Sequence, residues 1–154
     1  MSRAKTPRVS VQHLVVCERA SVSGTPGPDN AYNLTGVGHS FAVPTGTVYP
    51  ATVPSLDLFI RFFVQRSGTG EFVIRYSWVD APAGRTRLLD EYGPLTIFFR
   101  PGQPIRNYMV RLRNLELAGS GRYALRLTQL RPHHVQGIRQ RVLRTEYFVV
   151  VEQS

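Results

Sequence analysis

Hydrophobic and polar residues alternate with a period of two along most of the 154-residue chain. The alternating segments are short and are separated by turns rich in Gly, Pro, Asn and Asp, which is typical of antiparallel sheets. No segment shows the period of 3.6 residues that marks an amphipathic helix. The pattern predicts eight or nine strands, which fall at residues 9–19, 34–43, 56–65, 71–80, 86–91, 95–100, 105–117, 121–130 and 143–152.

This strand content in a chain of ordinary domain length predicts a single all-β domain. We expect a two-sheet antiparallel β-sandwich of immunoglobulin-like or jelly-roll-like type, which spans residues 9–152. A basic, flexible tail at residues 1–8 is expected to precede it. A basic loop or hairpin tip at residues 131–142 is expected before the last strand.

The expected location follows from three features of the chain. The single cysteine excludes a disulfide within the chain. No apolar run reaches the length of a membrane-spanning helix. The basic start leads into alternating residues instead of the apolar block of a signal peptide. The sequence therefore predicts a cytoplasmic protein without membrane insertion.

The strand at residues 56–65 is apolar on both of its faces. One face carries Leu, Ile, Phe and Val residues, and the other carries Phe59 and Phe63. Such a strand is either covered on both sides or contributes to an interface. Phe59 and Phe63 are therefore our candidate contacts for a protein partner or a second copy of the chain. The short link at residues 66–70 predicts that this strand forms a hairpin with the strand at 71–80.

The chain is strongly basic, with a formal net charge of +9, and 18 of its 19 basic residues are arginine. Residues 100–154 hold ten arginines and three acidic residues. Such an excess can mark a surface for nucleic acid or another polyanion. An arginine bias of this kind also arises from a GC-rich coding sequence, and both explanations stay open.

Arg111 and Arg113 lie two positions apart in the strand at residues 105–117, and Arg122 and Arg126 lie four positions apart in the strand at 121–130. If these strands form a hairpin, the period of two places four arginines on one outer face. That face is either an anion-binding patch or the ordinary solvated side of a sheet. With three arginines from the basic stretch near the last strand, the candidate anion-binding or nucleic-acid-binding residues are Arg111, Arg113, Arg122, Arg126, Arg139, Arg141 and Arg144.

No combination of residues indicates catalysis or a bound metal. Cys17 and His13 lie four residues apart on one predicted strand, a separation of about 13 Å that prevents contact. The four histidines and ten acidic residues form no metal-binding or nucleophile motif. We therefore expect no enzymatic activity, no catalytic residues, no metal and no cofactor. The aromatic residues Phe72, Tyr76 and Trp78 share one strand face, which suits the core or, if exposed, a sugar-binding platform.

Several short segments resemble an uncharacterised bacterial family of small immunoglobulin-like β-sandwich proteins. They are a strand that ends in Cys17-Glu18, the segments Asn33-Leu34-Thr35-Gly36-Val37 and His39-Ser40-Phe41, and a crossover bounded by Pro44 and Pro54. The segment Gly121-Arg122-Tyr123-Ala124-Leu125-Arg126-Leu127 matches the closing strand of many β-sandwiches. The resemblance covers about residues 10–130. It implies a sandwich fold and no known activity.

These observations favour a non-enzymatic β-sandwich that works as a binding or assembly module, with a protein partner or a second copy as its ligand. Binding of nucleic acid or another polyanion by an arginine-rich face is the first alternative. A carbohydrate-binding module that uses aromatic stacking is the second.

Overall fold

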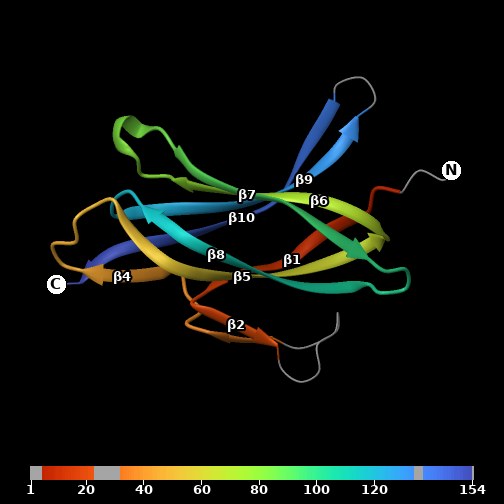
Figure 1. The fold of residues 1–154 in the computed structure, drawn as a ribbon, viewed down its shortest axis with the longest axis horizontal. Helices are drawn as coiled ribbons and strands as arrows, with labels where there is room; N and C mark the ends of the chain where they lie inside the picture. The colour runs from red at the N-terminus through yellow and green to blue at the C-terminus, as the bar shows by residue number, and fades with distance from the viewer. Residues whose placement is uncertain (1–4, 23–31, 134–136, 154) are drawn as a thin grey trace.

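The chain is all-β in a computed structural model that describes residues 5–22, 32–133 and 137–153 (Figure 1). Among the described residues there is no helix long and apolar enough to cross a membrane. One 3-10 turn, η1 (Pro82–Gly84), interrupts the strands. The strands are β1 (Arg8–Cys17), β2 (Arg19–Val22), β3 (Tyr32–Thr35), β4 (Ser40–Pro44), β5 (Ala51–Arg66), β6 (Gly68–Trp78), β7 (Arg87–Phe99), β8 (Ile105–Leu117), β9 (Gly121–His133) and β10 (Gly137–Gln153).

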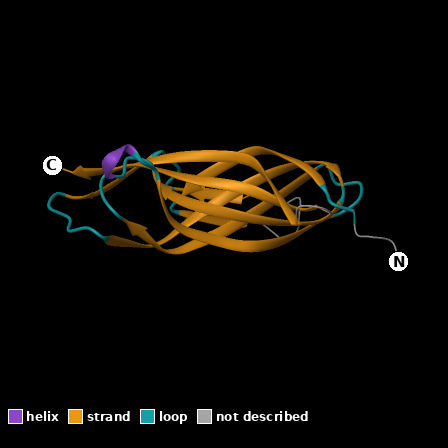
Figure 2. Ribbon diagram, turned by 90° about the horizontal axis from the view of Figure 1, so that it is seen from above, coloured by secondary structure: helices purple, strands orange, loops and turns teal. Residues whose placement is uncertain are grey.

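The strands form three sheets. A three-stranded sheet has the order β1-β5-β8, a five-stranded sheet has the order β4-β10-β9-β6-β7, and β2 pairs with β3 alone. All pairs are antiparallel except β4 with β10. The β2–β3 hairpin lies beneath the three-stranded sheet in Figure 1. The molecule is elongated, and β1 begins at the end opposite to that where β10 finishes (Figure 2).

Aromatic side chains fill the space between the three-stranded and five-stranded sheets. The ring of Phe62 on β5 lies 5.3 Å from that of Phe72 on β6 and 5.2 Å from that of Phe99 on β7. Tyr123 stacks on Phe148 at 5.3 Å farther along the core. These aromatic residues occupy the apolar positions of the alternating pattern, so the period of two places them on one side of each strand. The core therefore joins the two larger sheets into one body.

Two strand pairs expected as hairpins lie in different sheets. β5 and β6 are adjacent in the chain, but β5 belongs to the three-stranded sheet and β6 to the five-stranded sheet. β8 and β9 are separated in the same way. Gly68, with φ of +146°, allows the sharp turn between β5 and β6. The crossing buries the apolar faces of both strands against each other, which a hairpin within one sheet would not do.

Both basic segments at the ends of the predicted domain are more ordered than expected. Pro7 is buried, and its carbonyl accepts a hydrogen bond of 3.1 Å from Nε2 of Gln129. The predicted tail is therefore packed against β9 at Pro7, and residues 1–4 lie outside the described part. The stretch 131–142, expected as a loop or hairpin tip, continues β9 to His133 and resumes as β10 at Gly137.

Candidate functional site

Phe59 is covered by the chain itself. Its side chain is 7% exposed, and its ring lies 5.2 Å from that of Tyr32 on β3. Most of β2 and the first half of β3 lie between the predicted strands at residues 9–19 and 34–43, so the sequence did not predict that they cover Phe59. Phe63 is 37% exposed and pairs across the sheet with Ile105, which is 36% exposed. Of the two predicted contacts, only Phe63 is on the surface.

A buried carboxylate anchors the β2–β3 hairpin to the three-stranded sheet. Asp57 on β5 is 1% exposed and accepts two hydrogen bonds from Arg111 on β8, at 2.9 and 3.1 Å. It also accepts a 2.7 Å hydrogen bond from the backbone N–H of Ala20 on β2. These hydrogen bonds, led by that from Arg111, lower the pKa of Asp57. Arg111 is therefore neutralised inside the fold.

Cys17 lies beside this carboxylate and is chemically protected. Its Sγ lies 3.5 Å from the carbonyl oxygen of Asp57, and its side chain is fully buried. Burial, with the nearby charge of Asp57, raises the pKa of the thiol to about 11. Cys17 is thus a structural cysteine.

We expect Cys17 to resist a maleimide or disulfide reagent at pH 8 while the protein is folded. The cause is that the thiolate is the reactive form and burial disfavours it. Mass spectrometry should show labelling of the one cysteine only after denaturant is added. Labelling of the native protein at the rate of a small-molecule thiol would contradict this structural role.

The four arginines expected on one hairpin face lie in two different sheets. Arg111 and Arg113 belong to β8 in the three-stranded sheet, whereas Arg122 and Arg126 belong to β9 in the five-stranded sheet. Arg122 forms an ion pair with Asp80, with Nη2 at 3.0 Å from Oδ1. Arg113 and Arg126 are exposed and form no ion pair among the described residues. The predicted four-arginine face is therefore not formed.

The arginines of β10 share one side of their strand. Arg139 pairs with Arg131 of β9, and Arg141 pairs with Gln129, so the period of two places their side chains on the same side. Gln129 is the residue that contacts the carbonyl of Pro7, so this side faces the start of β1. A bulge between Val142 and Arg144 precedes Arg144, whose Nη1 lies 3.4 Å from two carbonyl oxygens of β1.

Two arginines from the opposite sheet complete a cluster at this end of the molecule. Arg8 on β1 and Arg66 on β5 are cross-strand partners. Burial, followed by the positive charges of Arg141, Arg66 and Arg8, lowers the pKa of Arg131. We name Arg8, Arg66, Arg131 and Arg141 the arginine cluster. None of the four forms an ion pair within the described part of the chain.

Arg131 lies at the centre of the arginine cluster and is incompletely paired. Its Nε–H is buried and has no hydrogen-bond partner. A guanidinium stays protonated in proteins, so burial and repulsion do not remove its charge. A buried donor without a partner is costly, and such a group recurs where a ligand supplies the missing acceptor. The cluster can therefore accept an anion without displacing any internal ion pair.

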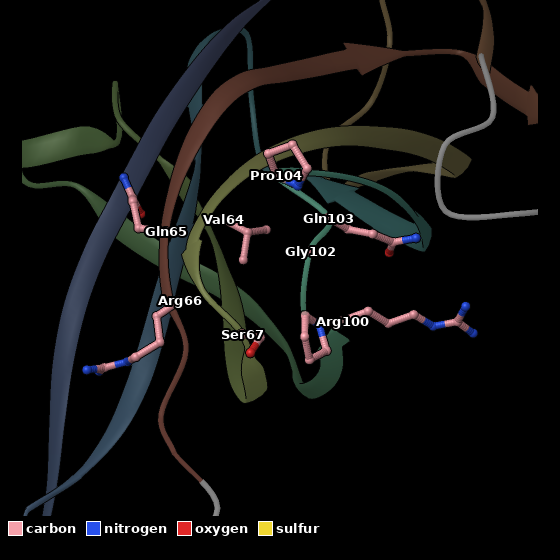
Figure 3. Close-up of a pocket in the computed structure, with 9 residues that line it drawn as sticks. Val64, Gln65, Arg66, Ser67, Arg100, Gly102, Gln103 and Pro104 are labelled. Carbon is pink, nitrogen blue, oxygen red and sulfur yellow. The ribbon is translucent and has the colours of Figure 1, made fainter.

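A pocket of about 480 Å³ adjoins the arginine cluster at Arg66 (Figure 3). It lies between the end of β5 and the turn after β7, and Arg66 and Arg100 leave it in opposite directions. The pocket extends the positively charged surface from the arginine cluster toward the β7–β8 turn.

A metal-binding group of side chains is not found among the residues that the structure describes. No three His, Cys, Asp or Glu side chains gather there. Trp78 donates its indole N–H to the carbonyl of Ser120 at 3.2 Å, and its ring lies against Gly119. The Trp78 indole therefore makes contacts within the fold, and these contacts argue against its use for stacking on a sugar.

Comparison with models of known protein families finds no match, and no curated protein of known function is similar to the chain. The resemblance to a bacterial sandwich family therefore stays a prediction from its short motifs. The candidate site rests on its own geometry.

Proposed function

We propose that the chain is a non-enzymatic binding module whose ligand is a phosphate-bearing polyanion held by the arginine cluster. The observation that carries this proposal is the convergence of Arg8, Arg66, Arg131 and Arg141 from four strands without a carboxylate among them. Arginine forks match the oxygens of a phosphate, and charge-assisted hydrogen bonds of this kind are strong.

The alternative explanation, a merely solvated arginine surface, accounts less well for this arrangement. Exposed arginines in a fold tend to spread apart or pair with acids, as Arg75 does with Glu91 at 3.2 Å. Burial, and after it the like charges of the other arginines in the cluster, lower the pKa of the half-buried Arg131. An anionic ligand relieves that repulsion, so the cluster is better suited to a bound polyanion than to the free protein.

The finer architecture belongs to the same proposal. We infer that the three-stranded and five-stranded sheets form a β-sandwich around the aromatic core, with the β2–β3 hairpin as an addition outside it. Ten strands are described where eight or nine were expected, because β2 is additional and the predicted strand at 34–43 is divided into β3 and β4, whereas the predicted strands at 86–91 and 95–100 form the single strand β7. A cytoplasmic location is supported by the free, buried thiol, which is common in reducing compartments.

Self-association is a second candidate, favoured by the exposed pair Phe63 and Ile105 on the three-stranded sheet. An apolar interface of this kind predicts a concentration-dependent mass in light scattering that persists in high salt. The variant Phe63→Ser would then be monomeric. A constant monomer mass at all concentrations would remove this candidate and leave polyanion binding as the proposed function.

Binding to a labelled single-stranded oligonucleotide of about 20 nucleotides, followed by fluorescence anisotropy, tests the proposal. Four phosphate contacts give a slope near −3 in a plot of log K against log salt, and about fiftyfold weaker binding at 200 mM than at 50 mM. Arg8→Gln and Arg66→Gln are each expected to weaken binding about tenfold, the effect of losing one charged hydrogen bond.

The matched controls are Arg85→Gln and Arg126→Gln, which remove the same charge from exposed sites outside the arginine cluster. They are expected to change affinity by less than about threefold. Competition by inorganic polyphosphate distinguishes recognition of phosphate from recognition of bases. Equal losses in cluster and control variants would mean that net charge alone binds the probe, and the site would be rejected.

A further inference from the structure

A second pocket of about 390 Å³ opens into the core at the opposite part of the fold, beside β4. Its walls come from the edge of β4, the first residues of β5, the end of β8 and the last part of β10. The lining residues are Glu18, Phe41, Ala42, Val43, Val53, Pro54, Ser55, Leu56, Leu117, Phe148 and Val150. The volume lies in the range of small-molecule sites, and the lining is almost wholly apolar.

The pocket exists because two strand edges diverge there. β1 ends at Cys17, opposite Asp57, whereas β5 continues back to Ala51 with only β8 as its partner. β4 is the edge of the five-stranded sheet and pairs only with β10. Side chains that are otherwise sealed in the core, Phe148 and Leu117 among them, therefore line an opening to the outside.

A polar pocket of about 260 Å³ adjoins this apolar pocket. It shares Glu18 and Ser55 with it and is otherwise lined by Arg19, Asp57, Arg111 and Arg113. Asp57 and Arg111 neutralise each other through their two hydrogen bonds. The remaining charges are those of Arg19, Arg113 and Glu18, which sum to +1. The polar pocket thus offers two arginines for one remaining carboxylate.

We propose that the two adjoining pockets form a binding site for a small amphiphile with an apolar body and an anionic head group. The apolar body occupies the space between β4 and β5, and the head group lies against Arg19 and Arg113. Neither arginine has a hydrogen bond or ion pair to an acidic side chain among the described residues, so both are available to a carboxylate or a phosphate.

Pairing by an additional β-strand is disfavoured at this opening. Pro44 ends the β4 edge and Pro54 lies in the β5 edge. Proline lacks a backbone N–H, so each edge lacks one of the donors that an added strand requires. Glu18 is held against Gly36 by the turn after β3, which keeps its carboxylate at the boundary between the pockets. The site therefore suits a compact molecule with a polar end.

Two dyes of similar shape test the proposal. One is 1-anilinonaphthalene-8-sulfonate, which is anionic, and the other is N-phenyl-1-naphthylamine, which is uncharged. Both are expected to bind with enhanced fluorescence. Val43→Phe and Val53→Phe, which enlarge lining side chains on two different strands, are expected to weaken both dyes at least tenfold. Both valines are only partly buried, so the larger side chains take up pocket volume without replacing a fully buried core residue.

Arg113→Gln is expected to weaken the anionic dye about tenfold and to leave the uncharged dye unchanged. The matched control Arg126→Gln should change the affinity for neither dye. Arg66→Gln, which alters the arginine cluster, should also leave both dye affinities unchanged and so shows that the two sites are distinct. Displacement by decanoate and by decyl phosphate then distinguishes the carboxylate head group from the phosphate. The proposal is overturned if both pocket-filling variants bind the dyes normally, if Arg113→Gln behaves like its control, or if neither amphiphile displaces the dye.

Discussion

Replacing Asp57 by Ala is expected to lower the free energy of unfolding by about 3 kcal/mol, the low end for a broken buried ion pair. The change removes both acceptors of Arg111 and leaves the backbone N–H of Ala20 without its partner. The low end applies because Arg111 has a 39% exposed side chain and can be rehydrated. Urea unfolding followed by far-UV circular dichroism measures the loss.

The β2–β3 hairpin is expected to detach before the rest of the fold in this variant. Its contacts with β5 are the Asp57–Ala20 hydrogen bond and the packing of Tyr32 on Phe59. Hydrogen exchange should therefore rise in β2 and β3 while the five-stranded sheet stays protected. The double variant Asp57→Leu/Arg111→Met is the control, because replacing both partners by apolar residues leaves no unpaired charge. Equal destabilisation in the double variant would show that packing, and not the ion pair, is responsible.

The pH dependence of stability has a defined sign at this residue. The hydrogen bonds from Arg111 and Ala20 lower the pKa of Asp57 in the folded protein. Its contribution is therefore fully present above the unfolded pKa of about 3.9 and is lost as the pH falls through the folded value. The stability difference between wild type and Asp57→Asn is expected to be constant above about pH 5 and to shrink below about pH 4.

The period of two in the sequence was sufficient to place side chains on strand faces, but not to assign strands to sheets. The alternating residues from Phe72 to Tyr76 are buried as expected. The link at residues 66–70 suits a hairpin equally well as a crossover, because both need a glycine-rich turn. The packing of Phe62 on Phe72 across the core shows that the link is a crossover between sheets. The sequence of one strand does not indicate which other strand it pairs with.

In the candidate site, too, the sequence predicted some of the residues but not which strands come together. Arg139 and Arg141 were predicted as anion-binding residues from their charge alone, because the sequence places them in a basic loop and not on the strand β10. Arg8, Arg66 and Arg131 were missed because they lie in the predicted tail, at a strand end and in a predicted loop. Their proximity depends on the pairing of Arg8 with Arg66, which are 58 positions apart, and on the contact of Gln129 with Pro7, which are 122 positions apart. Phe59 was misjudged because β2 and β3 are short and adjoin a segment rich in Gly and Pro.

The double variant Arg131→Met/Arg141→Gln is expected to bind the oligonucleotide about a hundredfold more weakly than the wild type at low salt. Each lost arginine removes a charge-assisted hydrogen bond, worth about tenfold in affinity. The slope of log K against log salt should fall in magnitude by about 1.5, because two fewer counterions are released. Arg85→Gln/Arg126→Gln is the control, since it lowers the net charge by the same amount outside the arginine cluster.

The same double variant is expected to be more stable than the wild type when no ligand is present. Met at position 131 removes a buried N–H that lacks a partner and one of four mutually repelling charges. The gain is about 1 kcal/mol, or a rise of about 2–4 °C in Tm, and it should shrink in high salt. Thermal unfolding with and without polyphosphate measures both effects, because a bound ligand stabilises only the protein that binds it. If the arginine cluster is a binding site, the charge repulsion destabilises the free protein, and replacing the arginines stabilises it. If the arginines serve only solubility or packing, replacing them leaves the stability of the protein unchanged or lowers it. A destabilised double variant that binds as well as its control would therefore assign the arginine cluster to the fold and not to a ligand.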